Sequence, residues 1–446
     1  MSPMTRFTVR LISRVTLAVA LQGAVAWAEP VTVSLELANP VMLANQKGTT
    51  YLRLSMTGAE PADADHRAPV NVAFVIDKSG SMQGEKIARA KDALRMAVGK
   101  LRDDDIVSIV AYDTNVRVLV PATKLTDRQQ VYATIAQIEA GESTALFAGV
   151  SKGAAELRKF LDKERVNRIV LLSDGLANIG PSSPGDLAEL GTSLGREGIA
   201  VTTIGLGLDY NEDLMTKLAQ KSDGNHMFAE SAADLEQAFM REFGDVLTVV
   251  AQEVKATIHC GEGVRPVRML GRQADIVGQN ISFSLNQLYG GQTKYAIVEV
   301  EVTGQAATSS MQLATASVSC MSIASKTTET MRSTVLASFT DSPQEVEEKT
   351  NADVMVAAVY QISAERNIMA MRLRDEGKID EAQQTLETNV FYLQENAKRW
   401  NSETLRLYEF SNIAAKDNIR EIDRYMPQRK RMQEEQYQIQ NQQKAR

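Results

Sequence analysis

The sequence predicts a doubly wound, Rossmann-like α/β domain that is flanked by a β-sandwich and followed by an α-helical region. Three observations lead to this prediction. In residues 68–245, short apolar runs alternate with segments whose apolar residues have helical spacing, as in βα units around a mostly parallel sheet. On both sides, in residues 29–67 and 246–341, apolar and polar residues alternate as in half-buried strands. From about residue 342 the periodicity is helical.

The elements of the α/β domain follow from continuous apolar runs, which are typical of strands that helices cover on both faces. The expected strands are 70–76, 105–112, 116–120, 167–173 and 200–205. The expected helices are 85–101, 127–139, 145–163, 185–197, 211–220 and 232–243. Open sheets of this kind bind ligands at the carboxyl ends of their strands, so a functional site is expected in the loops there.

The flanking segments are expected to form a single β-sandwich, with the α/β domain inserted between its strands. The expected strands are 31–37, 50–56, 246–259, 280–285, 295–302 and 311–319. Antiparallel strands with one face in a core and one in solvent show this alternation of apolar and polar residues.

Residues 342–417 are expected to form a helical hairpin region. One long amphipathic helix is predicted over 345–373, a second ends near Asn396, and a third covers 402–417. The remaining residues, 418–446, are rich in Gln, Lys, Arg and Glu, so we expect an exposed helix or a disordered tail.

Residues 1–28 have the three-part layout of a secretory signal peptide. Three arginines come first, an apolar run follows, and Ala26-Trp27-Ala28 offers a cleavage site before Glu29. A retained membrane anchor is the alternative, but the apolar stretch is shorter than the roughly 20 residues that span a bilayer. We expect a periplasmic or secreted protein with no stable membrane span after cleavage.

Composition excludes two classes of function. The chain has 49 Lys and Arg against 56 Asp and Glu, a net charge of −7 that becomes −10 once the three signal-peptide arginines are removed. Such an acidic protein lacks the positive field that nucleic-acid binding through phosphate contacts requires. Three histidines and two cysteines provide no clustered zinc ligands. A metal would therefore be held mainly by oxygen.

The two cysteines, Cys260 and Cys320, have one possible pairing. In an oxidising compartment we expect a disulfide that closes a loop of about 60 residues. The alternative is a pair of buried free thiols.

Three loops carry the oxygen ligands of a candidate metal site. Asp77-Lys78-Ser79-Gly80-Ser81-Met82 follows the first strand of the α/β domain and offers one carboxylate and two hydroxyls at alternating positions. Thr144 precedes a helix, and Asp174 follows the central strand. Carboxylates and hydroxyls are hard ligands that suit Mg²⁺, with Mn²⁺ or Ca²⁺ as alternatives.

The order Asp-x-Ser-x-Ser, then Thr, then Asp resembles the metal-ion-dependent adhesion site of the von Willebrand factor A family. Further similarity lies in residues 172–175 and 203–211, and the resemblance covers about residues 68–243. It implies that Asp77, Ser79, Ser81 and Thr144 bind the metal directly and that Asp174 acts through water. The alternative is a set of turn and helix-cap residues.

The resemblance also implies a function. A metal held by two carboxylates and by hydroxyls has an exchangeable position that can accept an Asp or Glu from a protein partner. We therefore expect an exported adhesion or complex-assembly protein without catalytic activity, similar in architecture to exported bacterial members of the family and to inter-alpha-trypsin inhibitor heavy chains. Residues 80–86 miss the spacing of a phosphate-binding loop. A hydrolase of unrecognised type and a scaffold that binds through its C-terminal helices are the alternatives.

Overall fold

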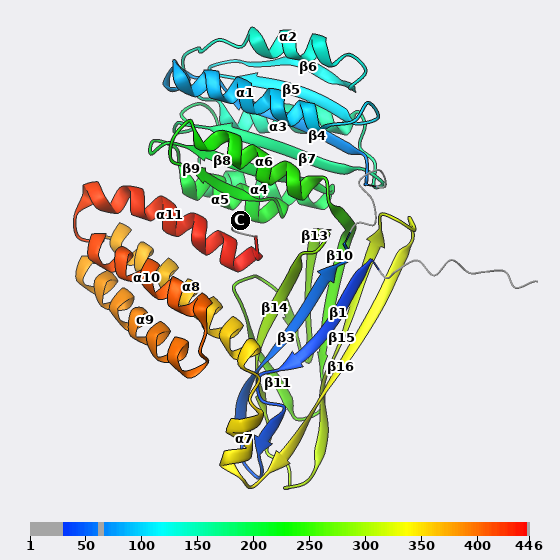
Figure 1. Ribbon diagram of the computed structural model, residues 1–446, viewed down its shortest axis with the longest axis vertical. Helices are drawn as coiled ribbons and strands as arrows, with labels where there is room; N and C mark the ends of the chain where they lie inside the picture. The colour runs from blue at the N-terminus through cyan, green and yellow to red at the C-terminus, as the bar shows by residue number, and fades with distance from the viewer. Residues whose placement is uncertain (1–29, 61–66, 444–446) are drawn as a thin grey trace, which may run out of the picture.

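The computed structural model describes residues 30–60 and 67–443. Figure 1 shows three bodies: an α/β domain, an elongated pair of β-sheets, and a group of helices beside both. The fold class predicted from the sequence is confirmed. The expected signal peptide lies outside the described residues and stays a prediction. In the described part of the chain, no helix is both long and apolar enough to cross a membrane.

A six-stranded sheet forms the centre of the α/β domain, in the order β6-β5-β4-β7-β8-β9. Its strands are β4 (Val70–Asp77), β5 (Ile106–Tyr112), β6 (Val116–Lys124), β7 (Val166–Ser173), β8 (Ile199–Leu206) and β9 (His226–Ala229). Neighbouring strands are parallel except β5 and β6. Strands β4, β7 and β8 are buried along their whole length, because helices cover both faces.

Helices pack on the two faces of this sheet and form two separate apolar cores. They are α1 (Glu85–Lys100), α2 (Arg128–Ala136), α3 (Leu146–Arg158), α4 (Pro184–Arg196), α5 (Glu212–Ser222) and α6 (Asp234–Val246). Alternate residues of β4 enter opposite cores, since side chains alternate across a strand. Phe74 packs with α1 and α6, whereas Val75 packs with α3, α4 and α5.

The two flanks of the α/β domain form one β-sandwich, as predicted. One sheet has the order β1-β3-β14-β11 and the other the order β12-β13-β10-β15-β16-β2. The strands are β1 (Val31–Leu37), β2 (Val41–Leu43), β3 (Gly48–Gly58), β10 (Val249–Cys260), β11 (Val264–Leu270), β12 (Asp275–Val277), β13 (Asn280–Tyr289), β14 (Thr293–Val302), β15 (Ser310–Ser322) and β16 (Thr328–Thr340). Strand β3 from the N-terminal flank pairs with β14 from the C-terminal flank over ten residues.

The expected disulfide between Cys260 and Cys320 is wrong, because both cysteines are free and buried. They lie on the paired strands β10 and β15, but Cys260 faces Ala314, six positions from Cys320 along β15. Six strand residues span about 20 Å, whereas a disulfide needs Cα atoms within about 7 Å. Both thiols instead fill the sandwich core, where burial raises the pKa of each to about 11.

The helical region begins with two helices where the sequence predicted one. They are α7 (Pro343–Lys349) and α8 (Ala352–Asp375), and the break lies at Asn351, whose side chain accepts hydrogen bonds from two backbone N–H groups of α8. Helices α9 (Ile379–Arg399) and α10 (Glu403–Asn418) follow. Helix α8 also packs on the sandwich, where Leu270, Ile297 and Ala358 share a small core.

Of the two alternatives for the C-terminal residues, the structure shows the helix, but this helix is not exposed as predicted. Residues Ile422–Asn441 form α11, which lies between the α/β domain and helices α8 and α10 (Figure 1). Much of its buried face is polar: Lys430 and Gln436 are buried beside Tyr437 and Ile439. A composition rich in charged and amide groups predicts exposure, whereas here those groups find partners on other elements.

Candidate metal centre

The three candidate loops meet at the carboxyl edge of the central sheet. Strand β4 ends at Asp77, and β7 ends one residue before Asp174. These two strands are adjacent and parallel, with Ile76 beside Leu172. Both carboxylates therefore leave the sheet at the same edge, and both are fully buried.

Asp77 is held by two hydrogen bonds. The Ser79 backbone N–H donates to its Oδ1 at 2.8 Å, and the Ser173 hydroxyl donates to its Oδ2 at 2.8 Å. Burial raises the pKa of Asp77 above its ordinary value, and the bonds from Ser79 and Ser173 oppose that rise. The negative charge of Asp174 raises the pKa further.

The two serines of the first loop connect to the second carboxylate. Ser79 Oγ and Ser81 Oγ lie 3.0 Å apart, and Ser81 Oγ donates to Asp174 Oδ1 at 2.7 Å. Ser79 is buried, whereas Ser81 is exposed. Solvent or a partner can therefore approach this group of oxygens from the side of Ser81.

Thr144 reaches the same point from the second loop. A methyl group on Gly175 would lie 3.4 Å from Ser81 Oγ and 3.5 Å from Thr144 Oγ1, so both hydroxyls lie beside this glycine. The Thr144 backbone N–H donates to Asn178 Oδ1 at 2.9 Å, which fixes the loop that precedes α3. The structure thus brings all five predicted ligands together.

Backbone contacts hold the first and second loops against each other. Gly80 N–H donates to Glu142 O at 2.8 Å, and Gly141 N–H donates to Lys78 O at 2.5 Å. Lys78 also forms an ion pair with Asp113, which follows β5. These contacts hold the first two ligand loops side by side.

The donor set fits a divalent cation. The hydroxyl hydrogens of Ser81 and Ser173 point to carboxylates. Ser81 then accepts from Ser79 with one of its two lone pairs and keeps the other for a metal. In residues 30–60 and 67–443, no three His, Cys, Asp or Glu side chains gather into a metal-binding group. A cation here would therefore need the hydroxyls as well as the two carboxylates, which is a hard, oxygen-only set.

Sequence reasoning missed two residues of this centre. Ser173 is the hydrogen-bond donor to Asp77, and Lys86 Nζ lies 2.6 Å from Asp174 Oδ2. In the sequence, Lys86 stands out only within residues 80–86, which miss the spacing of a phosphate-binding loop. Its position in the first turn of the helix after the ligand loop is a signal that could have placed it near the centre.

His226 does not belong to this centre. It lies on β9, fully buried, and its Nδ1 is 2.8 Å from Thr203 Oγ1. Burial lowers the pKa of His226 to about 3, so the ring is neutral. These features indicate a structural role for His226.

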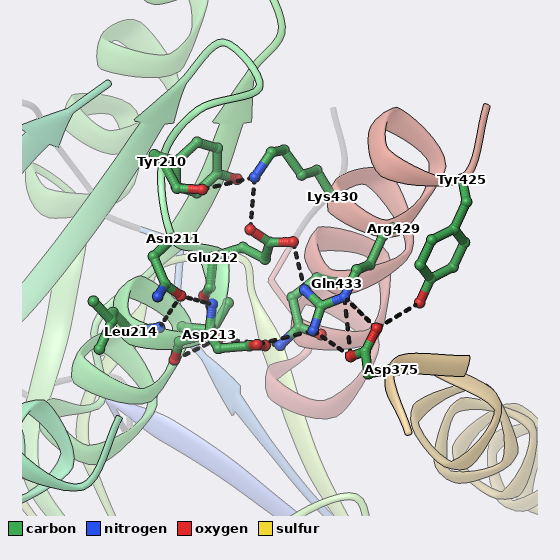
Figure 2. A network of polar contacts seen from close by, with 11 residues as sticks. Tyr210, Asn211, Glu212, Asp213, Leu214, Asp375, Tyr425, Arg429, Lys430 and Gln433 are labelled. Atoms are coloured by element: carbon green, nitrogen blue, oxygen red, sulfur yellow. Dashed lines mark hydrogen bonds and ion pairs between the residues drawn. The ribbon is translucent and has the colours of Figure 1, made fainter. Parts of the chain in front are cut away.

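A second polar cluster joins α11 to the loop between β8 and α5 (Figure 2). Lys430 Nζ donates to Glu212 Oε2 at 2.6 Å and to the Tyr210 carbonyl at 2.7 Å. Arg429 contacts Glu212, Asp213 and Asp375. Burial would raise the pKa of Glu212, but the two cations lower it below its ordinary value. We refer to these residues as the α11 clamp.

Known proteins resemble the α/β domain in sequence. A model of the von Willebrand factor type A domain matches residues 71–241, so the chain contains such a domain. The uncharacterized protein YfbK of Escherichia coli (strain K12) is 30% identical over 190 residues, which are 42% of this chain and 33% of YfbK. Inter-alpha-trypsin inhibitor heavy chain H3 of Homo sapiens is 29% identical over 199 residues, 42% of this chain and 22% of that protein. The chain thus spans a third or less of these two relatives.

Solved structures resemble the whole described fold. A von Willebrand factor type A protein from Catenulispora acidiphila has a TM-score of 0.66 at 17% identity, covering 84% of this chain and 89% of that one. The ArnB paralog VWA2 from Sulfolobus acidocaldarius has a TM-score of 0.62 at 17% identity, covering 92% and 98%. At this identity the likeness establishes the fold alone, so function is argued from the site.

Proposed function

We propose that the centre formed by the three loops binds a divalent cation, and that the cation holds a carboxylate of a protein partner. Mg²⁺ is the proposed ion, with Mn²⁺ and Ca²⁺ as alternatives. The proposed direct ligands are Asp77, Ser79, Ser81 and Thr144, and Asp174 acts through water. When bound, the ion supplies a Lewis-acidic position that can take an Asp or Glu side chain.

The direction of the hydroxyl hydrogen bonds carries this proposal. Ser81 donates to Asp174 and Ser173 donates to Asp77, so both carboxylates are acceptors. One lone pair of Ser81 accepts from Ser79, and the other stays available. The alternative role as helix caps finds little support. Ser79 precedes a short 3₁₀ helix (Gly80–Met82) but its side chain makes no capping bond. Helix α3 also has no side-chain cap.

The role that follows is adhesion or complex assembly and not catalysis. Two buried carboxylates and the neighbouring hydroxyls can hold a divalent ion, whose exchangeable position is suited to take an anionic group of a partner. The match to a von Willebrand factor type A domain supports this assignment. The partner we propose is an exported protein with an accessible Asp or Glu.

Substitution of Asp77 tests the metal centre. We expect Asp77→Asn and Asp77→Ala to lose Mg²⁺ binding by at least about 100-fold, since a buried ligand charge is removed. Isothermal titration calorimetry with Mg²⁺ on the full chain measures this, and chelation with EDTA should lower the melting temperature of the wild type only.

Glu142→Gln is the matched control for this test. Glu142 lies in the second loop with an exposed side chain, and only its backbone carbonyl takes part in the loop contacts. Its substitution should change Mg²⁺ affinity by less than about threefold, as expected for a solvated charge. Wild-type protein that binds no divalent cation at millimolar concentration would contradict the proposal.

A scaffold that binds through its helices is the second candidate. Three large apolar side chains on the adjacent helices α9 and α10 are exposed: Phe391 by 63%, Leu407 by 61% and Phe410 by 66%. Exposed aromatic groups are typical anchors of protein interfaces. If this surface binds the partner, Phe391→Ser with Phe410→Ser should abolish EDTA-resistant partner capture in a pull-down and leave Mg²⁺ binding unchanged. Capture that depends only on Asp77 would contradict this candidate.

A further inference from the structure

Lys86 is the one basic side chain that bonds a predicted metal ligand in the described part of the chain. Its Nζ lies 2.6 Å from Asp174 Oδ2, while Asp174 Oδ1 accepts the Ser81 hydroxyl. The Asp174 side chain is 0% exposed and the Lys86 side chain 29% exposed. A buried carboxylate and a partly exposed ammonium group therefore form a direct pair at the edge of the metal centre.

The fold provides the room for this pair. Lys86 occupies the first turn of α1, and Gly84, with φ +84°, turns the chain into that helix. Gly207 follows β8 and also has a positive φ, +74°. A methyl group on Gly207 would lie 3.7 Å from Lys86 Nζ, so the lysine lies over this glycine on its way to Asp174. Glycine is the residue that best permits this positive φ.

We propose that Lys86 sets the charge of the metal centre so that the bound cation prefers an anionic partner. The inference rests on the proposed function, because it assumes a divalent cation at the centre. Asp77, Asp174 and Lys86 together carry a charge of about −1, which a divalent cation changes to about +1. A partner carboxylate then brings the centre to neutrality. Without Lys86 the loaded centre would already be neutral, and a carboxylate would make it negative.

This role has two effects of opposite sign. The positive charge of Lys86 repels the cation and competes with it for Asp174, so it weakens metal binding. The same charge attracts the partner carboxylate once the metal is bound. A lysine with a purely structural role would behave differently, because loss of the packing around Asp174 would weaken both binding steps.

Lys86→Gln and Lys86→Met separate these effects in the full chain. Gln can still donate a hydrogen bond to Asp174 but carries no charge, and Met keeps the length of the side chain alone. We expect both variants to bind Mn²⁺ about tenfold more tightly than wild type by calorimetry. We expect the Mn²⁺-loaded variants to bind acetate at least about threefold more weakly, measured by water-proton relaxation, because acetate displaces a metal-bound water.

Arg89→Met is the matched control. Arg89 lies on the same helix as Lys86, but its ion pair with Glu85 is exposed and contains no predicted ligand. Its loss should alter both affinities by less than about threefold. Lys86→Arg keeps the charge and should behave like wild type: it should bind acetate more tightly and Mn²⁺ more weakly than Lys86→Gln.

The possible outcomes distinguish this inference from the proposed function. If wild type binds Mn²⁺ and Lys86→Gln shows the same metal and acetate affinities, the inference is overturned and the proposed metal site stands. If Lys86→Gln folds, judged by circular dichroism, yet binds both ligands more weakly, the lysine is structural and the inference fails. If neither protein binds Mn²⁺, the proposed function itself fails.

Discussion

At the scale of single residues, buried ionic groups define the two polar clusters of this protein. Asp77 and Asp174 are buried at the metal centre, and Lys430 is 1% exposed in the α11 clamp. A buried charge is tolerated only when it is paired and hydrogen-bonded. Lys430 meets this condition through Glu212, the Tyr210 carbonyl, and the face of the Tyr210 ring at 4.2 Å.

Loss of Lys430 should therefore destabilise the protein strongly. Lys430→Met leaves Glu212 buried with part of its compensation removed, and breaking such a pair costs about 3–5 kcal/mol. Urea unfolding followed by circular dichroism measures the change. Arg431→Met is the control, because Arg431 lies on the same helix as Lys430 but forms an exposed pair with Glu230, for which about 0–1 kcal/mol is expected. Equal losses of unfolding free energy in Lys430→Met and Arg431→Met would contradict the conclusion that burial makes the Lys430 pair costly to break.

At the scale of elements, α11 covers the free edge of the central sheet. Strand β9 ends the sheet order, so its outer N–H groups have no strand partner in the described chain. Side chains at the C-terminal end accept them instead: Glu434 Oε1 from Phe228 N–H at 3.1 Å and Gln443 Oε1 from His226 N–H at 3.2 Å. An open sheet edge can pair with other chains, and α11 prevents such pairing at β9.

Two glutamates of α11 should make stability depend on pH. Burial raises the pKa of Glu434 and of Glu435 to about 7, from an ordinary value of 4.5. Between pH 4.5 and about 7 the folded protein therefore binds more protons than the unfolded chain, so stability falls as pH rises. Double substitution of Glu434 and Glu435 by Gln keeps an acceptor oxygen for Phe228 N–H and removes the titration.

We expect this double variant to show no such decline in urea unfolding between pH 5 and pH 8. At pH 8 it should be more stable than wild type by about 1–2 kcal/mol, less than the full pKa difference implies, because both side chains keep some contact with solvent. Glu387→Gln, on the exposed face of α9, should leave the profile unchanged. A stability difference between the double variant and wild type that stays constant from pH 5 to pH 8 would refute the assignment.

At the scale of the whole molecule, polar contacts join the α/β domain to the sandwich. Arg168 on β7 is fully buried and donates to Gln287 Oε1 at 2.7 Å and to Tyr289 Oη at 2.6 Å, both on β13. Nearby acidic and phenolic groups raise the pKa of Arg168 even though burial opposes this, so the guanidinium stays charged. With α11 on a second side, the α/β domain is held at two places (Figure 1).

The sequence by itself determined the elements that depend on local patterns. Continuous apolar runs predicted β4, β7 and β8, and alternation predicted the two flanks of the sandwich, because both patterns follow from the period of a single strand. The five candidate ligands were predicted from the oxygen-bearing residues of three loops and from the resemblance to a known family pattern. Asp77 and Asp174 end or follow predicted parallel strands, whose carboxyl ends lie at one edge of the sheet.

Only the tertiary structure decided which distant side chains meet. The bonds from Ser173 to Asp77 and from Lys86 to Asp174 join loops whose orientation no local pattern encodes. The packing of α11 rests on partners more than 200 residues away in the sequence, such as Glu212 for Lys430. The separation of the two cysteines depends on strand register, which the pairing of β10 and β15 sets. Hydrophobic periodicity is local, whereas polar pairing and register are properties of the assembled fold.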